Sequence, residues 1–115
     1  MQKTRGKPMR YLMMSKATDQ TPDEKLYAEM GKFIEEMTAA GVLLATGGLS
    51  PKGIRVASAG DEITVTDGPF TEAKEAVAGF ALVEVRSEEE AIELARRFRK
   101  VVGDGESIIQ QVFGP

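Results

Sequence analysis

The sequence of 115 residues contains no cysteine and no histidine. Without cysteine the protein cannot form disulfides, a thiolate nucleophile, a zinc–thiolate site or an iron–sulfur cluster. Without histidine it lacks the commonest general base and the commonest ligand of transition metals. Any catalysis therefore has to use carboxylates, lysine, tyrosine, hydroxyls or backbone groups.

These absences also predict that the protein holds no metal ion and no cofactor. An all-oxygen Mg²⁺ or Ca²⁺ site built from Asp67, Glu72 and Glu75 is conceivable. However, these acids do not have the spacing of a calcium-binding loop.

The glycines near residue 50 do not predict a nucleotide site. Gly48 and Gly53 have the four-residue gap of a phosphate-binding loop, but Ile54 and Arg55 stand where Lys and Ser/Thr are required. We expect Gly47 and Gly48 to let the backbone bend or pass close to a ligand or partner.

The chain also lacks long apolar runs and an excess of positive charge. No apolar run approaches the ~20 residues needed to cross a bilayer, and no secretion signal is recognised. The formal net charge is −3, which provides no basic stripe for nucleic acid. We therefore expect a soluble, cytoplasmic protein that binds neither nucleic acid nor membrane.

The length predicts one domain, large enough to bury a core of its own. Residues 1–8 carry Lys3, Arg5 and Lys7 and almost nothing apolar, which is typical of a flexible basic arm. The domain itself is expected to span residues 9–115. Within it, short apolar runs bounded by polar or turn residues predict four buried strands: Met9–Ser15, Val42–Thr46, Ala78–Val85 and Ser107–Phe113.

The first helix is predicted to begin at a capping box, with Thr21 as N-cap, Pro22 at the first helical position and Glu24 reaching back. Gly41 is expected to end it. One apolar stripe runs along this helix: Leu26, Met30, Phe33, Ile34 and Met37.

The second helix is predicted to begin at another capping box, formed by Ser87 and Glu90. Glu93 and Arg97 have the spacing of an ion pair along the helix. Acids in the first turn and bases in the last complement the helix dipole, so we interpret the basic cluster as a helix-end feature rather than a binding patch. Its members are Arg96, Arg97, Arg99 and Lys100.

Residues 54–58 and 62–66 are predicted to form a β-hairpin with a two-residue turn at Gly60-Asp61. A three-residue turn would mix apolar and polar residues on each face. The two-residue turn pairs like with like: Val56 with Val65, and Arg55 with Thr66.

The order of these elements predicts an α+β fold, a ferredoxin-like split β-α-β sandwich with an inserted hairpin. The two helices would cover one face of the sheet. Because the strands carry apolar residues on both faces, the second face needs a cover as well. We therefore expect a homodimer.

The densest polar chemistry lies in residues 66–75, where a strand gives way to a turn and a short helical run. We expect a cleft here for a small organic anion, with Asp67 as hydrogen-bond acceptor or general base and Arg55 as an anion clamp. Whether the site is catalytic or only binds is left open. The remaining predicted ligand-binding residues are Thr66, Lys74 and Glu75, with Tyr11 or Phe70 as an apolar wall. In the alternative interpretation, Asp67 only closes its turn and Arg55 only pairs with a nearby acid.

The segments Val65-Thr66-Asp67-Gly68-Pro69-Phe70-Thr71-Glu72, Lys74-Glu75 and Gly79-Phe80 resemble the signature of DGPF-domain proteins, a branch of the YCII-related family. The resemblance implies a dimeric α+β barrel, in which two sheets stack face to face and a cleft lies near the stack. Members of the broader group are thought to use a His–Asp pair, which this histidine-free chain cannot form; Asp67 is the half that could remain. Some DGPF-domain proteins resemble partners or fusions of alternative sigma factors, which implies a second possibility, a non-catalytic interaction module linked to transcription.

Overall fold

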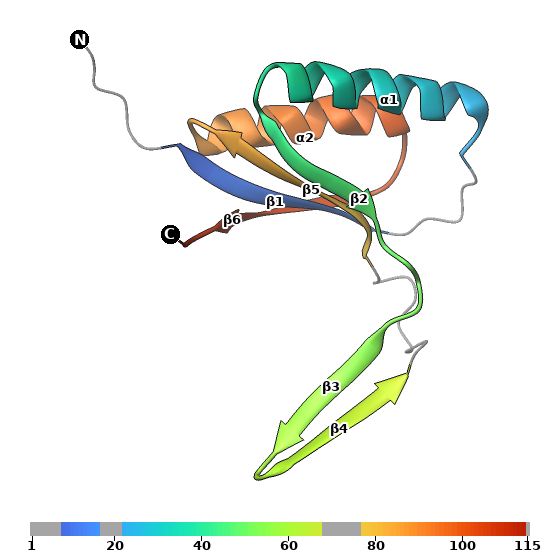
Figure 1. The fold of residues 1–115 in the computed structure, drawn as a ribbon. Helices are drawn as coiled ribbons and strands as arrows, with labels where there is room; N and C mark the ends of the chain where they lie inside the picture. The colour runs from blue at the N-terminus through green and yellow to red at the C-terminus, as the bar shows by residue number, and fades with distance from the viewer. Residues whose placement is uncertain (1–7, 17–21, 68–76, 115) are drawn as a thin grey trace.

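Two helices and six strands form the described part of the computed structural model, which covers residues 8–16, 22–67 and 77–114 (Figure 1). The mixed α+β class predicted from the sequence is therefore confirmed. The elements are β1 (Met9–Lys16), α1 (Glu24–Ala39), β2 (Leu43–Gly48), β3 (Ile54–Ala59), β4 (Glu62–Asp67), β5 (Val77–Val85), α2 (Glu88–Val102) and β6 (Ser107–Val112).

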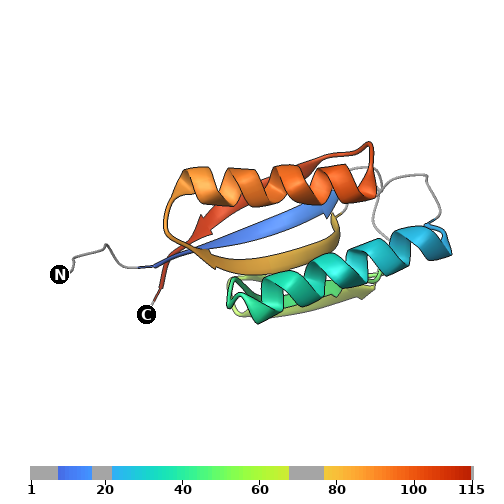
Figure 2. The ribbon, with the colours of Figure 1, turned by 90° about the horizontal axis from the view of Figure 1, so that it is seen from above.

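Four of the strands form one antiparallel sheet in the order β2-β5-β1-β6. The long apolar strand β5 lies between β2 and β1. Both helices lie on the same face of this sheet (Figure 2). The sheet is open at β2 and β6, so a single chain does not close into a barrel.

The core lies between the two helices and the centre of the sheet. Alternate residues of β1 and β5 point toward the helices because successive side chains of a strand face opposite sides. The buried residues are Tyr11, Met13, Met37, Val83, Val85, Ala91 and Leu94. No polar or charged residue is buried within the described ranges.

The start of α1 differs from the prediction. The N-cap is Asp23, whose side chain accepts a hydrogen bond of 2.8 Å from the backbone N–H of Leu26. Asp23 takes this role because its extended backbone aims the carboxylate at the free N–H groups of the first turn. Thr21, the predicted cap, lies outside the described residues.

The start of α2 follows the prediction closely. Ser87 Oγ accepts a hydrogen bond of 3.1 Å from the N–H of Glu90, and Glu90 Oε1 accepts one of 2.8 Å from the N–H of Arg86. The Glu90 side chain thus reaches one residue further back than in the predicted box. Gly103, with a φ of 89°, follows the last turn.

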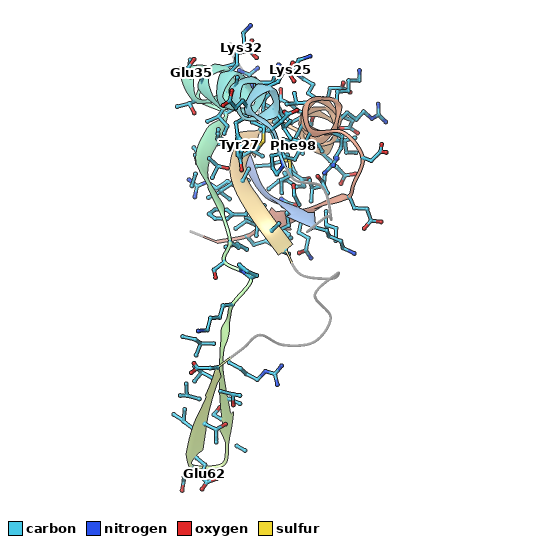
Figure 3. All side chains as sticks on the ribbon, turned by 90° about the vertical axis from the view of Figure 1, so that its right-hand side faces the viewer. Lys25, Tyr27, Lys32, Glu35, Glu62 and Phe98 are labelled. Carbon is cyan, nitrogen blue, oxygen red and sulfur yellow. The ribbon has the colours of Figure 1, made fainter. Side chains whose placement is uncertain are left out.

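The hairpin of β3 and β4 has the predicted register. Val56 pairs with Val65 and Arg55 with Thr66, and Gly60 adopts a φ of 62° in the two-residue turn. Neither strand pairs with the four-stranded sheet. The hairpin projects from the side of the sheet opposite the helices (Figures 1 and 3), with Glu62 near its far end.

No element of the described chain covers the sheet face away from the helices, which is largely apolar but also carries Arg10, Glu84 and Gln110. Leu12 pairs with Leu82, and Met14 with Phe80, on the strand positions that alternate with the core residues. Ile108 of β6 lies beside Met14 and is 42% exposed. This surface, called the open face below, comprises Leu12, Met14, Phe80, Leu82, Ile108 and Val112.

Replacing Asp23 with alanine should destabilise the fold by about 1 kcal/mol, because the N–H of Leu26 loses its partner. The measurement is the free energy of unfolding by urea. Thr21→Ala is the control and should change it by less than about 0.5 kcal/mol. If Thr21→Ala lowered the free energy of unfolding more than Asp23→Ala, the N-cap would be Thr21 and not Asp23.

Candidate functional site

A cavity of about 430 Å³ lies between α1 and the sheet. Its walls are large apolar side chains of the two helices. Tyr27 and Phe98 lie on the sheet side of α1 and α2, respectively (Figure 3). The helical residues that line the cavity are Tyr27, Met30, Phe33, Ile34, Met37, Leu94 and Phe98.

The floor of the cavity contains small residues in two neighbouring rows of the sheet, together with the larger Met13, Leu43 and Val83. Ser15, Gly79 and Gly48 are paired across three strands in one row. The next row contains Met13, Ala81 and Thr46. Small side chains beneath a helix leave space that the helix side chains do not fill, and this space is the cavity.

Gly79 has a steric reason to remain glycine. A Cβ built there would lie 3.3 Å from the carbonyl oxygen of Gly47, a closer approach than side-chain carbons ordinarily make to backbone. Gly47 is similarly restricted, since its Cβ would lie 3.2 Å from the ring of Phe80. These contacts oppose larger residues along the β2–β5 pair.

α1 lines the cavity along most of its length and is fixed near its C-terminal end. Met37 is the one residue of α1 that is buried, whereas Tyr27 is 62% exposed. Near the C-terminal end, Arg97 of α2 forms an ion pair of 3.2 Å with Glu36. The Arg97 guanidinium carbon also lies 5.2 Å from the centroid of the Phe33 ring. Arg97 therefore holds α1 against α2 beside the cavity.

This role of Arg97 corrects a sequence prediction. Glu93 forms its ion pair with Arg96, at 3.6 Å, and Arg97 forms one with Glu36. The helix-end interpretation of the basic cluster holds for Arg99, which donates a 2.8 Å hydrogen bond to the carbonyl of Gly103.

The polar groups of the described lining are uncharged. Thr46 Oγ1 donates a 2.8 Å hydrogen bond to the carbonyl of Phe80, and Ser15 Oγ lies 3.5 Å from Ser107 Oγ. Tyr27 contributes a third hydroxyl. Among the described residues that line the cavity, none is Asp, Glu, Lys or Arg.

The residues of the predicted anion site are only partly brought together. Arg55 and Thr66 are direct partners on one face of the hairpin. Asp67 is paired with Ile54, so the alternation of side chains places it on the other face. Phe70, Lys74 and Glu75 lie outside the described residues.

Tyr11 has a different role from the predicted wall. It is 4% exposed and belongs to the core beneath the helices. Burial, together with Glu88 and Glu89, raises the pKa of its hydroxyl. Tyr11 therefore supports the sheet rather than an anion site on the hairpin.

The described residues contain no cluster of three or more acidic side chains that could hold a metal ion, and Glu72 and Glu75 lie outside them. Of the described helices, none is long and apolar enough to cross a membrane.

The cavity was not predicted from the sequence, although one signal pointed toward it. Gly47 and Gly48 were expected to allow close approach of a ligand or partner, and both line the cavity. The apolar stripe of α1 forms the opposite wall. Only the pairing of β2 with β5 brings the small floor residues under that stripe.

The fold and cavity define a small α+β domain with helices on one sheet face and a projecting hairpin. The family model of the YCII-related domain matches residues 9–109, and the chain belongs to that family. The resemblance drawn from the central motif is thereby confirmed at the level of the family. A search of curated proteins found no match.

Replacing Arg97 with alanine should lower the free energy of unfolding by roughly 1 kcal/mol, because its contacts with Phe33 and Glu36 are lost. Arg96→Ala is the matched control on the same helix turn. Because the ion pair of Arg96 with Glu93 is exposed, Arg96→Ala should lower the free energy of unfolding by less than about 0.5 kcal/mol. Equal effects of the two substitutions in urea unfolding would contradict the bridging role of Arg97.

Proposed function

We propose that this protein binds a small molecule in the cavity between α1 and the sheet. The observation that carries the proposal is a cavity of about 430 Å³ with apolar walls. Ligand pockets are commonly ~300–1,000 Å³, mostly apolar, with a few polar groups that orient the ligand. The hydroxyls of Ser15, Thr46 and Tyr27 would supply those polar groups.

The lining favours an uncharged ligand with an apolar body. A carboxylate or phosphate placed there would lose hydration without a cationic side chain among the described lining residues to compensate for it. The described lining residues also include no carboxylate or lysine for acid–base catalysis, so we propose binding rather than turnover. The small organic anion predicted from Arg55 and Asp67 would require a separate site around the hairpin and the central motif, and that site remains a prediction.

We also propose that the protein acts as a homodimer through the open face. The strand order β2-β5-β1-β6, with a helix after β1 and another after β5, supports the expected ferredoxin-like arrangement. Stacking two open faces would cover the apolar residues that the helices cannot reach and give the dimeric α+β barrel. The ligand cavity would then lie on the outer side of each sheet, beneath the helices.

Filling the cavity should abolish binding without loss of stability. Ala81→Leu places three more carbons on the floor, between Met13 and Thr46. We expect the uncharged dye N-phenyl-1-naphthylamine to bind the unaltered protein and to lose at least tenfold in affinity to the variant, measured by fluorescence titration. The melting temperature should be unchanged or higher, because the added side chain fills apolar space.

The matched control is Ala28→Leu, the same change at an exposed position of α1 outside the cavity lining. It should leave the dye affinity unchanged. The proposal fails if the unaltered protein does not bind the dye, or if both variants bind it equally well. Preference for an anionic naphthalene sulfonate dye over the uncharged dye would contradict the ligand class.

The dimer is tested by placing a charge on the open face. Light scattering should give about twice 12.5 kDa for the unaltered protein, and Ile108→Glu should give a monomer, because a carboxylate would be buried between the sheets. Ile92→Glu on α2 is the control, since Ile92 is 36% exposed against 42% for Ile108. A monomer before any substitution, or a dimer unaffected by Ile108→Glu, would refute the open-face dimer.

A further inference from the structure

The hairpin presents a second apolar surface that nothing in the described chain covers. Alternation and register place four β-branched residues on one of its faces. They are 64–69% exposed, the highest values among the leucine, isoleucine and valine residues of the described ranges. This surface, called the hairpin stripe below, consists of Ile54, Val56, Ile63 and Val65.

A two-stranded ribbon of this kind needs support. An isolated hairpin is marginally stable in water, and a third strand or a packed layer is usually required. Every residue of β3 and β4 is exposed. Ser58 and Asp67 lie on the same face as the stripe, toward its two ends. The opposite face carries Arg55, Thr64, Thr66 and Glu62 together with Ala57 and Ala59, and is the more polar of the two. The hairpin stripe is therefore the face that a partner would cover.

The position of the hairpin indicates which partner. It projects from the sheet on the side away from the helices (Figures 1 and 3), which is also the side of the open face. A molecule that covers the open face thus comes to lie on the same side of the sheet as the hairpin. The described part of the chain leaves the β6 side of the open face uncovered, since Ile108 and Val112 are 42% and 41% exposed.

We infer that the hairpin is an intersubunit arm: its apolar stripe packs against a second copy of this chain in the open-face dimer. Two-fold symmetry makes the contact reciprocal, since each copy brings one open face and one hairpin. The inference rests on the proposed dimer and adds a second contact to it. The second copy is favoured over another protein because the dimer would place it beside the hairpin.

Site-specific photo-crosslinking tests the arm in the otherwise unaltered chain. The probe is p-benzoylphenylalanine at position 63, within the hairpin stripe, and at position 57, on the opposite face, as the control. Equal amounts of ¹⁵N-labelled and unlabelled protein are mixed, exchanged and irradiated. With the probe at position 63 we expect crosslinked peptides that join a ¹⁵N-labelled chain to an unlabelled chain. With the probe at position 57 we expect at least fivefold fewer of them.

A paired substitution tests what the contact contributes. Val56→Thr with Val65→Thr keeps β-branched residues in a cross-strand pair but makes the stripe polar. We expect the dimer dissociation constant from analytical ultracentrifugation to rise at least tenfold. The control, Ala57→Ser with Thr64→Ser, alters the neighbouring pair on the opposite face and should change it less than twofold.

Three outcomes would overturn the inference, and they are distinguishable from failure of the proposed dimer. Crosslinks confined to one chain, or absent from position 63 while light scattering still reports a dimer, would refute the arm and leave the open-face dimer standing. A dissociation constant unaffected by the paired substitution would do the same. A monomer in light scattering would refute both. The ligand proposal is independent of all three, because the cavity lies on the helix side of the sheet.

Discussion

The structure depends on a mismatch between one layer of helices and a sheet with two apolar faces. α1 and α2 cover one face, and the buried core they create holds seven residues of the described chain, none of them large and fully buried. Burying a leucine or isoleucine side chain that was exposed is worth roughly 1.5–3 kcal/mol. On the open face Ile108 and Val112 are 42% and 41% exposed and the other four residues are partly exposed, so further burial would add stabilisation, which is the physical reason to expect a second layer.

The same shortage of coverage explains the cavity. α1 is anchored at its C-terminal end by Met37 and by Arg97, which contacts Phe33 and pairs with Glu36. The sheet beneath the α1 stripe carries several small residues, which leave space that the helix side chains do not fill. A cavity of this origin is a cost to stability unless something fills it. A ligand that fills it would stabilise the folded state in proportion to its affinity and concentration, which connects the packing of α1 to the proposed function.

Local sequence patterns predicted part of the geometry around the proposed anion site. The two-residue turn at Gly60-Asp61 fixes the register of the hairpin, so the pairing of Arg55 with Thr66 was predictable. The same alternation places Asp67 and Arg55 on opposite faces of the hairpin, because Asp67 follows Thr66, the partner of Arg55, by one residue. Tyr11 was assigned to a ligand wall because strand polarity alone does not reveal which face receives the helices. The sequence predicted that one face of the sheet would be left uncovered by the helices, because the strands carry apolar residues on both faces and two helices can cover only one.

The sequence by itself determined the order of the elements, the α+β class, the hairpin register, the cap of α2 and the family. These features follow from periodicity, turn chemistry and motifs that act within a few residues of one another. Only the tertiary structure decided that β2 pairs with β5, that small residues of those strands lie beneath the α1 stripe, that Arg97 reaches Glu36 rather than Glu93, and that the hairpin stands apart from the sheet. Each of these depends on groups that are distant in the chain and meet only when the layers pack, and no local pattern specifies such a meeting.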